Sequence, residues 1–113
     1  MKWKRNLLIL NMILVLKQIN YEHSIIIRID VSDINIWAIL CQFIDGIENV
    51  VAFLSKKLSP QAKKWVTIDK EGYDIYYSIN KWKYYLHGYS FIVQTDHRNL
   101  VYILGSETER VAR

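Results

Sequence analysis

The sequence predicts an α/β fold: a three-stranded antiparallel meander joined by a long crossover helix to a parallel fourth strand. Three observations predict it. Alternating β-branched residues mark strands, short polar turns separate the first three of them, and a long stretch with helical periodicity precedes the last. The 113 residues suit one domain, and 51% of them are apolar, which is enough for a packed core.

Three strands are expected in the first half of the chain. Residues 24–31 (SIIIRIDV) alternate with a period of two, and residues 36–43 (IWAILCQF) are apolar almost throughout, as in an interior strand. Residues 49–55 (NVVAFLS) form the third strand. The turns are residues 32–35 (SDIN) and the Asp45-Gly46 pair, a strong hairpin signal. These connections predict an antiparallel meander.

One long helix and a fourth strand are expected in the second half. Thr67 is the predicted N-cap of a helix that runs to about Leu86 and stops at Gly88. Residues 89–95 (YSFIVQT) then form a strand parallel to the first. Residues 97–104 (HRNLVYIL) are expected to form a short helix.

Three carboxylates are expected to meet at one end of this sheet. Asp30 and Asp96 close the two parallel strands, and Glu71 lies near the start of the helix on an otherwise apolar stripe. Ligands of open α/β sheets bind beyond the carboxyl ends of parallel strands. Clustered carboxylates repel one another unless cations offset their charge, and oxygen ligands suit Mg²⁺ or Mn²⁺. Two such ions can hydrolyse a phosphodiester.

Each acid also has a purely structural interpretation when taken alone. Asp30 and Asp96 could be turn residues at strand ends, and Glu71 could stabilise the positive end of the helix dipole. Only their convergence favours a metal site.

Three segments of the chain resemble a known family. They are IIIRIDVSDINIWAILCQ, VVAFLSKKLSPQAKKWVTIDKEGYDIYYSINKWKYYLHG and FIVQTDHRNLVYIL. They are similar to the ribonuclease H domain of gypsy-type LTR retrotransposon polyproteins, over about residues 24–113. The resemblance implies a ribonuclease H-like mixed sheet with the final strand and helix missing. It also implies that Asp30, Glu71 and Asp96 are catalytic metal ligands.

The resemblance further implies a reaction and its partners. The substrate would be an RNA–DNA hybrid whose RNA strand is cut with Mg²⁺ or Mn²⁺. Reverse transcriptase and integrase would be neighbouring domains of the same polyprotein.

The chain also departs from the family pattern. The family's fourth carboxylate lies in a downstream segment, whereas this chain stops at ETERVAR. We therefore expect a C-terminally truncated domain, an incomplete two-ion site and impaired cleavage. Asp74 is the nearest substitute acid, but it stands where the family usually has a small or apolar residue and is expected to be a solvated flank. The alternative function is a non-catalytic retroelement remnant that retains nucleic-acid binding.

A basic loop and a histidine are weaker candidates for nucleic-acid contact. Lys56, Lys57, Lys63 and Lys64 lie in a stretch without acids, and the net charge of +4 permits an anionic partner. The loop could equally be a solvated basic surface. His97 could contact a phosphate or be an ordinary surface histidine. The many aromatic residues have helical spacing, which indicates packing rather than a platform for single strands.

The first twenty residues form a separate segment before a domain at residues 21–113. Residues 1–20 are an unassigned leader with a basic start and an apolar stretch, which leaves a signal or anchor and an extra helix as alternatives. The segment lacks an A-x-A-like cleavage site and is too short for a membrane span. We therefore expect no stable membrane association and an intracellular location, cytoplasmic or nuclear. The single cysteine, Cys41, is expected to be a buried thiol.

Overall fold

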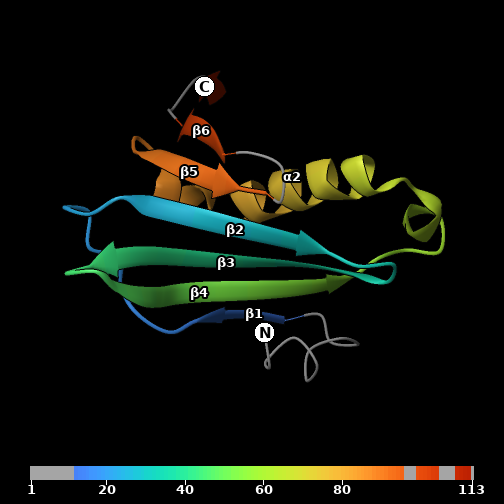
Figure 1. Cartoon of the computed structure of the whole chain (residues 1–113), viewed down its shortest axis with the longest axis horizontal. Coiled ribbons are helices and arrows are strands. Elements are labelled where there is room, and N and C mark those ends of the chain that lie inside the picture. The colour runs from blue at the N-terminus through green and yellow to red at the C-terminus, as the bar shows by residue number, and fades with distance from the viewer. Residues whose placement is uncertain (1–11, 96–98, 105–108, 113) are drawn as a thin grey trace.

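The computed structural model describes residues 12–95, 99–104 and 109–112. Within these ranges, strands form one mixed sheet in the order β1-β4-β3-β2-β5-β6-β7, and one long helix packs on it (Figure 1). The elements are β1 (Met12–Val15), β2 (Ile25–Val31), β3 (Asn35–Ile44), β4 (Ile47–Lys57), the 3₁₀ helix η1 (Ala62–Lys64), α2 (Thr67–Leu86), β5 (Ser90–Gln94), β6 (Asn99–Leu104) and β7 (Glu109–Ala112). The predicted α/β fold class is confirmed.

The antiparallel meander of β2, β3 and β4 is present with the predicted turns. In the β2–β3 turn, the Ser32 hydroxyl accepts a hydrogen bond of 3.0 Å from the backbone N–H of Asn35. In the β3–β4 turn, Asp45 and Gly46 have φ angles of 54° and 77°. Positive φ at both central residues is the geometry of a tight hairpin that matches strand twist, and Gly and Asp tolerate it well.

The crossover through α2 makes β5 parallel to β2, as predicted. The register pairs Ile25 with Phe91 and Arg28 with Gln94. The carboxyl ends of β2 and β5 therefore lie at the same end of the sheet. Because β4 also ends there, α2 begins at that end, which we call the carboxyl end of the sheet (Figure 1).

The main core lies between α2 and one face of the sheet. Its fully buried members include Ile27, Leu40 and Leu54 from the strands and Trp82 and Leu86 from the helix. Alternate residues of β2 and β3 point to the other face, where a smaller cluster forms. That cluster contains Ile26, Ile39 and Cys41, and the prediction that Cys41 is buried is confirmed.

The start of α2 differs from the prediction, whereas its end agrees. Val66 is the N-cap, and Thr67 is the first helical residue and does not cap the helix with its side chain. The Val66 carbonyl accepts hydrogen bonds from the N–H groups of Asp69 (3.1 Å) and Lys70 (3.2 Å). An extended residue before the helix thus supplies the first acceptor without a side-chain cap. The helix ends at Leu86, and Gly88 has a φ of 82°, which suits glycine.

The expected helix over residues 97–104 is wrong where the structure describes it. Asn99–Leu104 is instead strand β6, antiparallel to β5. Leu100 and Leu104 are buried in the main core, and Tyr102 stacks on Phe91 with ring centroids 5.5 Å apart. Because alternate residues of β6 reach the core, the strand extends the apolar surface under α2.

Part of the N-terminal leader belongs to the sheet. Residues 12–15, which an extra helix would have included, form β1 and pair antiparallel with β4. Ile13, Leu14 and Val15 are between 40% and 51% exposed, so this strand contributes backbone hydrogen bonds to the sheet but few buried side chains to the core. The division of the chain at residue 20 stays a prediction. No helix within the described ranges is long and apolar enough to cross a membrane.

Candidate functional site

Asp30 lies near the carboxyl end of β2 and is half-buried. It pairs with Trp37 of β3 in the ladder. Ile29 contributes to the core under α2, so alternation directs Asp30 to the opposite face. The Ser32 turn follows at once and holds the strand end in place.

Glu71 is the fifth residue of α2 and is only 8% exposed. It lies on the same side of the helix as Trp82 and Leu86, which pack on the sheet, in agreement with the predicted orientation. The preceding residue, Lys70, is 5% exposed, and its Nζ lies 3.9 Å from Oδ1 of Asp33 in the β2–β3 turn. That contact ties the start of α2 to the turn that follows Asp30.

Asp74 is not the solvated flank that the sequence predicted. Its side chain is fully buried, one turn beyond Glu71. Oδ1 lies 3.4 Å from the hydroxyl oxygen of Ser78, and Oδ2 has no hydrogen-bond partner among the described residues. Burial raises the pKa of Asp74 well above 3.8, and the charge of Glu71 raises it further, while hydrogen bonds from Ser78 and the Trp37 backbone oppose the rise. The sequence held a signal for this, because Asp74 lies about 60° from Glu71 on the helix.

Asp74 lies near both elements that carry the described carboxylates of the predicted site. The charge of Glu71 raises the pKa of Asp74, and a hydrogen bond with the Trp37 backbone lowers it. Trp37 in turn pairs with Asp30. Asp30 and Glu71 therefore reach the same end of the sheet, Asp30 from one face and Glu71 from the helix that covers the other.

The third predicted ligand, Asp96, and its neighbour His97 lie outside the described residues. Gln94, the last residue of β5, pairs with Arg28 two residues before Asp30. No group of three potential metal-binding side chains occurs within the described part of the chain. The three-carboxylate site thus stays a prediction, and the donors that are described, Asp30 and Glu71, have the oxygen chemistry that Mg²⁺ and Mn²⁺ prefer.

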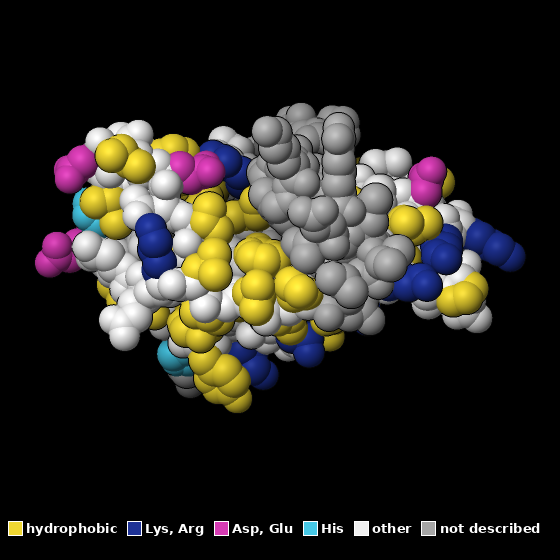
Figure 2. Space-filling view, turned by 90° about the horizontal axis from the view of Figure 1, so that it is seen from below, with side chains coloured by type: hydrophobic (Ala, Val, Ile, Leu, Met, Phe, Trp, Pro, Cys, Tyr) yellow, Lys and Arg dark blue, Asp and Glu magenta, His cyan; other side chains and the backbone are white. Residues whose placement is uncertain are grey.

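The four predicted basic residues divide into two pairs. Lys56 and Lys57 end β4, whereas Lys63 and Lys64 belong to η1. Figure 2 shows Lys and Arg side chains gathered at the end of the molecule where β4 leads into η1 and α2. The first pair lines a cavity of about 360 Å³, and the second does not. We call this cavity the lysine–tryptophan pocket; its lining residues are Lys56, Lys57, Ser59, Ala62, Trp65 and Tyr73.

Trp65 is one of the aromatic residues that the sequence predicted to pack, and for Trp65 this expectation is wrong. It lies between η1 and the N-cap of α2, so its position is not governed by helical packing. It is 42% exposed, and its ring meets that of Tyr73 edge to face, with centroids 5.7 Å apart. The signal available in the sequence was its place beside lysines in an acid-free stretch.

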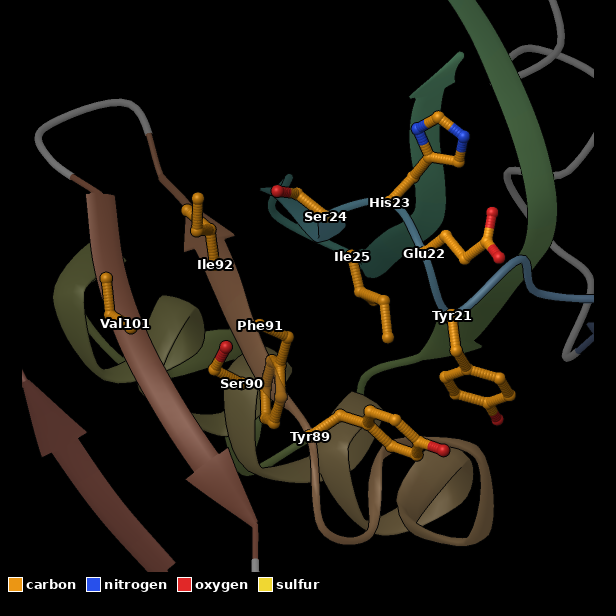
Figure 3. Close-up of a pocket in the computed structure, with 10 residues that line it drawn as sticks. All are labelled: Tyr21, Glu22, His23, Ser24, Ile25, Tyr89, Ser90, Phe91, Ile92 and Val101. Atoms are coloured by element: carbon orange, nitrogen blue, oxygen red, sulfur yellow. The ribbon is translucent and has the colours of Figure 1, made fainter.

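A second cavity, of about 380 Å³, lies at the opposite end of β2 and β5 (Figure 3). The rings of Tyr21 and Tyr89 stack at its rim with centroids 4.1 Å apart, and the Tyr21 hydroxyl donates a 2.8 Å hydrogen bond to the carbonyl of Tyr85. Ile25 and Phe91 form its apolar part. No predicted site residue lines it.

A family model described as an RNase H-like domain found in reverse transcriptase matches residues 20–113. The Transposon Tf2-3, Tf2-4 and Tf2-5 polyproteins of Schizosaccharomyces pombe are each 32% identical over 98 residues, which is 84% of this chain. The chain spans about 7% of the length of these relatives. The family match includes the positions of all three predicted carboxylates.

Proposed function

Because this chain belongs to the family of RNase H-like domains found in reverse transcriptase, we propose that it hydrolyses the RNA strand of RNA–DNA hybrids with divalent metal ions. It would act as one domain of an LTR-retrotransposon polyprotein, beside reverse transcriptase and integrase. An intracellular location, cytoplasmic or nuclear, is part of the same proposal.

One observation carries this proposal: two acids distant in the sequence come to one end of the sheet. Asp30 arrives on β2, and Glu71 arrives on α2, which begins at the end of the sheet where β2 ends. The strand order and the Lys70–Asp33 contact hold both elements in place. Carboxylates carried on rigid elements are what a metal-dependent phosphodiesterase requires before its ions bind.

The register of the parallel strands supports a role for Asp96. Positions 25, 26, 27 and 28 of β2 pair with positions 91, 92, 93 and 94 of β5. These pairs bring the end of β5 beside β2, the strand that carries Asp30. Asp96 follows β5 by two residues in the sequence and would add the third carboxylate of the proposed site.

The chain's own residues would bind and orient the ions. Asp30, Glu71 and Asp96 would hold them, and divalent ions bound there supply the charge that activates water and stabilises the leaving oxygen of a phosphodiester. The buried position of Glu71 restricts its rotamers, which keeps its carboxylate in place. Lys56, Lys57, Lys63, Lys64 and His97 would contribute phosphate contacts.

The test is cleavage of a labelled RNA–DNA hybrid with Mg²⁺ or Mn²⁺. Asp30→Asn and Glu71→Gln should each lower the rate at least about 100-fold, as expected for loss of a ligand or an electrostatic stabiliser. The matched control is Asp45→Asn, which removes one exposed carboxylate at the opposite end of the sheet and keeps a residue that tolerates positive φ. Equal cleavage by all four proteins would refute the site.

A second function has support from one residue. Asp74 buries a carboxyl group beside Glu71 with one oxygen unpartnered among the described residues, an arrangement that works against a tight metal site. A non-catalytic remnant would bind hybrid with an affinity that does not depend on Mg²⁺ and would not cleave it. Restoration of cleavage by Asp74→Ala would identify this residue as the cause.

A further inference from the structure

We propose that the lysine–tryptophan pocket binds one unpaired nucleotide of a single strand that continues beyond the hybrid. Its lysines would contact the phosphate, and Trp65 would stack on the base. The inference rests on the proposed function for the class of substrate, and it gives Lys56 and Lys57, two of the lysines proposed for phosphate contacts, a specific ligand: unpaired nucleic acid rather than paired hybrid.

The charge of the pocket fits a phosphate. Lys56 and Lys57 line it, and its described lining includes no acid. The Nζ of Lys56 lies 5.3 Å from the centroid of the Tyr77 ring. An ammonium group has three N–H donors, so this contact with the ring leaves donors for a phosphate oxygen. Ser59 adds a hydroxyl to the same wall.

The aromatic side of the pocket fits a base. Trp65 is 42% exposed, whereas Trp37 and Trp82 are 4% and 1% exposed, so Trp65 is the accessible indole among the described tryptophans. The edge-to-face contact with Tyr73, at an interplanar angle of 78°, fixes the orientation of the ring. Exposed, oriented aromatic rings are where proteins stack unpaired bases.

The walls of the pocket are anchored in the core. Leu58 and Ala62 are 3% and 4% exposed and pack with Ile36 of β3 in a cluster that Tyr73 also joins. The cavity volume of about 360 Å³ is within the usual range for small-ligand sites. The pocket is therefore a formed site of nucleotide size rather than a gap between mobile loops.

The ligand must be unpaired for a physical reason. In a duplex each base is stacked and hydrogen-bonded to its partner, so its face cannot meet Trp65 without being extruded. A strand that extends past the end of the hybrid has bases free to stack. Tyr73 lies two residues after Glu71, so the pocket is at the carboxyl end of the sheet, near the proposed cleavage site.

The experiment measures binding and not cleavage. Fluorescence anisotropy would compare a blunt RNA–DNA hybrid with the same hybrid carrying a short single-stranded RNA extension, with Ca²⁺ in place of Mg²⁺ to prevent hydrolysis. The full chain should bind the extended hybrid about tenfold more tightly, as expected for one stacked base. Trp65→Ala should abolish that preference, and Trp65→Phe should retain most of it.

Two variants serve as controls: Tyr84→Ala for the loss of an exposed aromatic ring, and Lys83→Gln for the loss of a lysine charge. Tyr84 is 86% exposed at the far end of α2, about 25 Å from its start, so Tyr84→Ala removes an exposed ring elsewhere. Lys57→Gln should lower the salt dependence of binding to the extended hybrid by about one phosphate contact. Lys83→Gln, beside Tyr84, should leave the preference for the extension unchanged.

Several outcomes would overturn the inference. It fails if wild type binds blunt and extended hybrids equally, or if folded Trp65→Ala keeps the preference. Thermal melting shows that each variant is folded. Quenching of tryptophan fluorescence by a single-stranded oligonucleotide gives an independent measurement of base stacking on Trp65, and this quenching should be absent in Trp65→Phe. Trp65-dependent binding without cleavage would support the nucleotide pocket and refute the proposed nuclease activity. Cleavage without a preference for the extension would support the nuclease activity and refute the nucleotide pocket.

Discussion

The hydroxyl oxygen of Ser78 lies 3.4 Å from Oδ1 of Asp74, one helical turn earlier, and both side chains are fully buried. This polar pair lies on the side of α2 that packs on the sheet, beside the apolar residues Ile79 and Trp82. The second carboxyl oxygen of Asp74 has no hydrogen-bond partner among the described residues. A buried polar atom without a partner costs stability, so this position is a weak point in the core.

Replacing Asp74 with alanine should stabilise the domain. The change removes the unpartnered buried oxygen, and the Ser78 hydroxyl keeps its hydrogen bond to the Asp74 backbone carbonyl. We expect the free energy of unfolding to rise by about 1–3 kcal/mol at neutral pH. Urea unfolding measures it. The control Asp69→Ala removes an exposed carboxylate of the first turn and should change stability by less than about 0.5 kcal/mol. A loss of stability in Asp74→Ala would contradict this account.

The same carboxyl group should make stability depend on pH. The pKa of Asp74 is raised in the folded state, chiefly by burial. Above 3.8, the ordinary value, the unfolded chain loses this proton while the folded chain keeps it. The folded state then binds more protons, so this contribution to stability falls as pH rises from 3.8 to the folded pKa. The unfolding midpoint, plotted against pH across that window, should fall with a slope that is smaller in Asp74→Ala. An unchanged slope would show that Asp74 does not cause this pH dependence.

Two glycines should respond to alanine in opposite directions. A Cβ added at Gly72, inside α2, or at Gly88, after it, would meet no atom within 4 Å. Gly72→Ala should raise the free energy of unfolding by about 1 kcal/mol, because alanine is the better helix former. Gly88→Ala should lower it by about 1 kcal/mol, because its φ of 82° is unfavourable for a residue with a Cβ. Thermal melting of the two variants side by side provides the comparison.

Cys41 should be chemically inert in the folded protein. The thiol is fully buried, and burial raises its pKa to about 11. Since the thiolate is the reactive form, a thiol reagent at mildly alkaline pH should label the native chain far more slowly than the chain in urea. Labelling at equal rates in both conditions would show that the face of the sheet around Ile39 opens readily.

Divalent ions should stabilise the folded state. If Asp30 and Glu71 belong to a metal site, Mg²⁺ at about ten times its dissociation constant adds about 1.4 kcal/mol to the free energy of unfolding. The stabilisation should be lost in Asp30→Asn and in Glu71→Gln and kept in Asp45→Asn. Calorimetric melting with and without Mg²⁺ measures this effect without any assay of cleavage. Equal shifts in all variants would indicate non-specific ion binding.

The elements predicted correctly are those with strong local signals. Alternation identified β2, the Asp45-Gly46 turn fixed the β3–β4 hairpin, and Gly88 follows the end of α2 as expected. The parallel direction of β5 followed from chain direction alone. In each case the local preference and the tertiary arrangement agree.

The wrong predictions involve segments whose structure depends on distant partners. Residues 99–104 became a strand because β5 offers them an open edge and the core under α2 accepts Leu100 and Leu104. Residues 12–15, which belong to the unassigned leader, form a strand because β4 offers them its free edge. A short apolar run does not distinguish helix from strand, and only the available edge decides between them.

The sequence predicted the position of Glu71 in the candidate site, but it did not predict which side chains surround the site. Helical spacing correctly placed Glu71 on the buried side of the helix. The same spacing could have placed Asp74 there, but its charge led to the prediction that it is exposed to solvent. Helical spacing led to the wrong assignment of Trp65 as a packing residue, because Trp65 precedes the helix. Which lysines line a cavity depends on how β4, η1 and α2 pack together, and this is a tertiary property.

The pairing of Ile25 with Phe91 joins strands that are far apart along the chain. Bringing such distant segments together carries a large loop-closure entropy, whereas the meander closes through short turns. We therefore expect the hairpins to assemble early and the β2–β5 contact to limit the folding rate. Since that contact also brings the end of β5 beside β2, the strand that carries Asp30, the proposed site would form only in the last kinetic step.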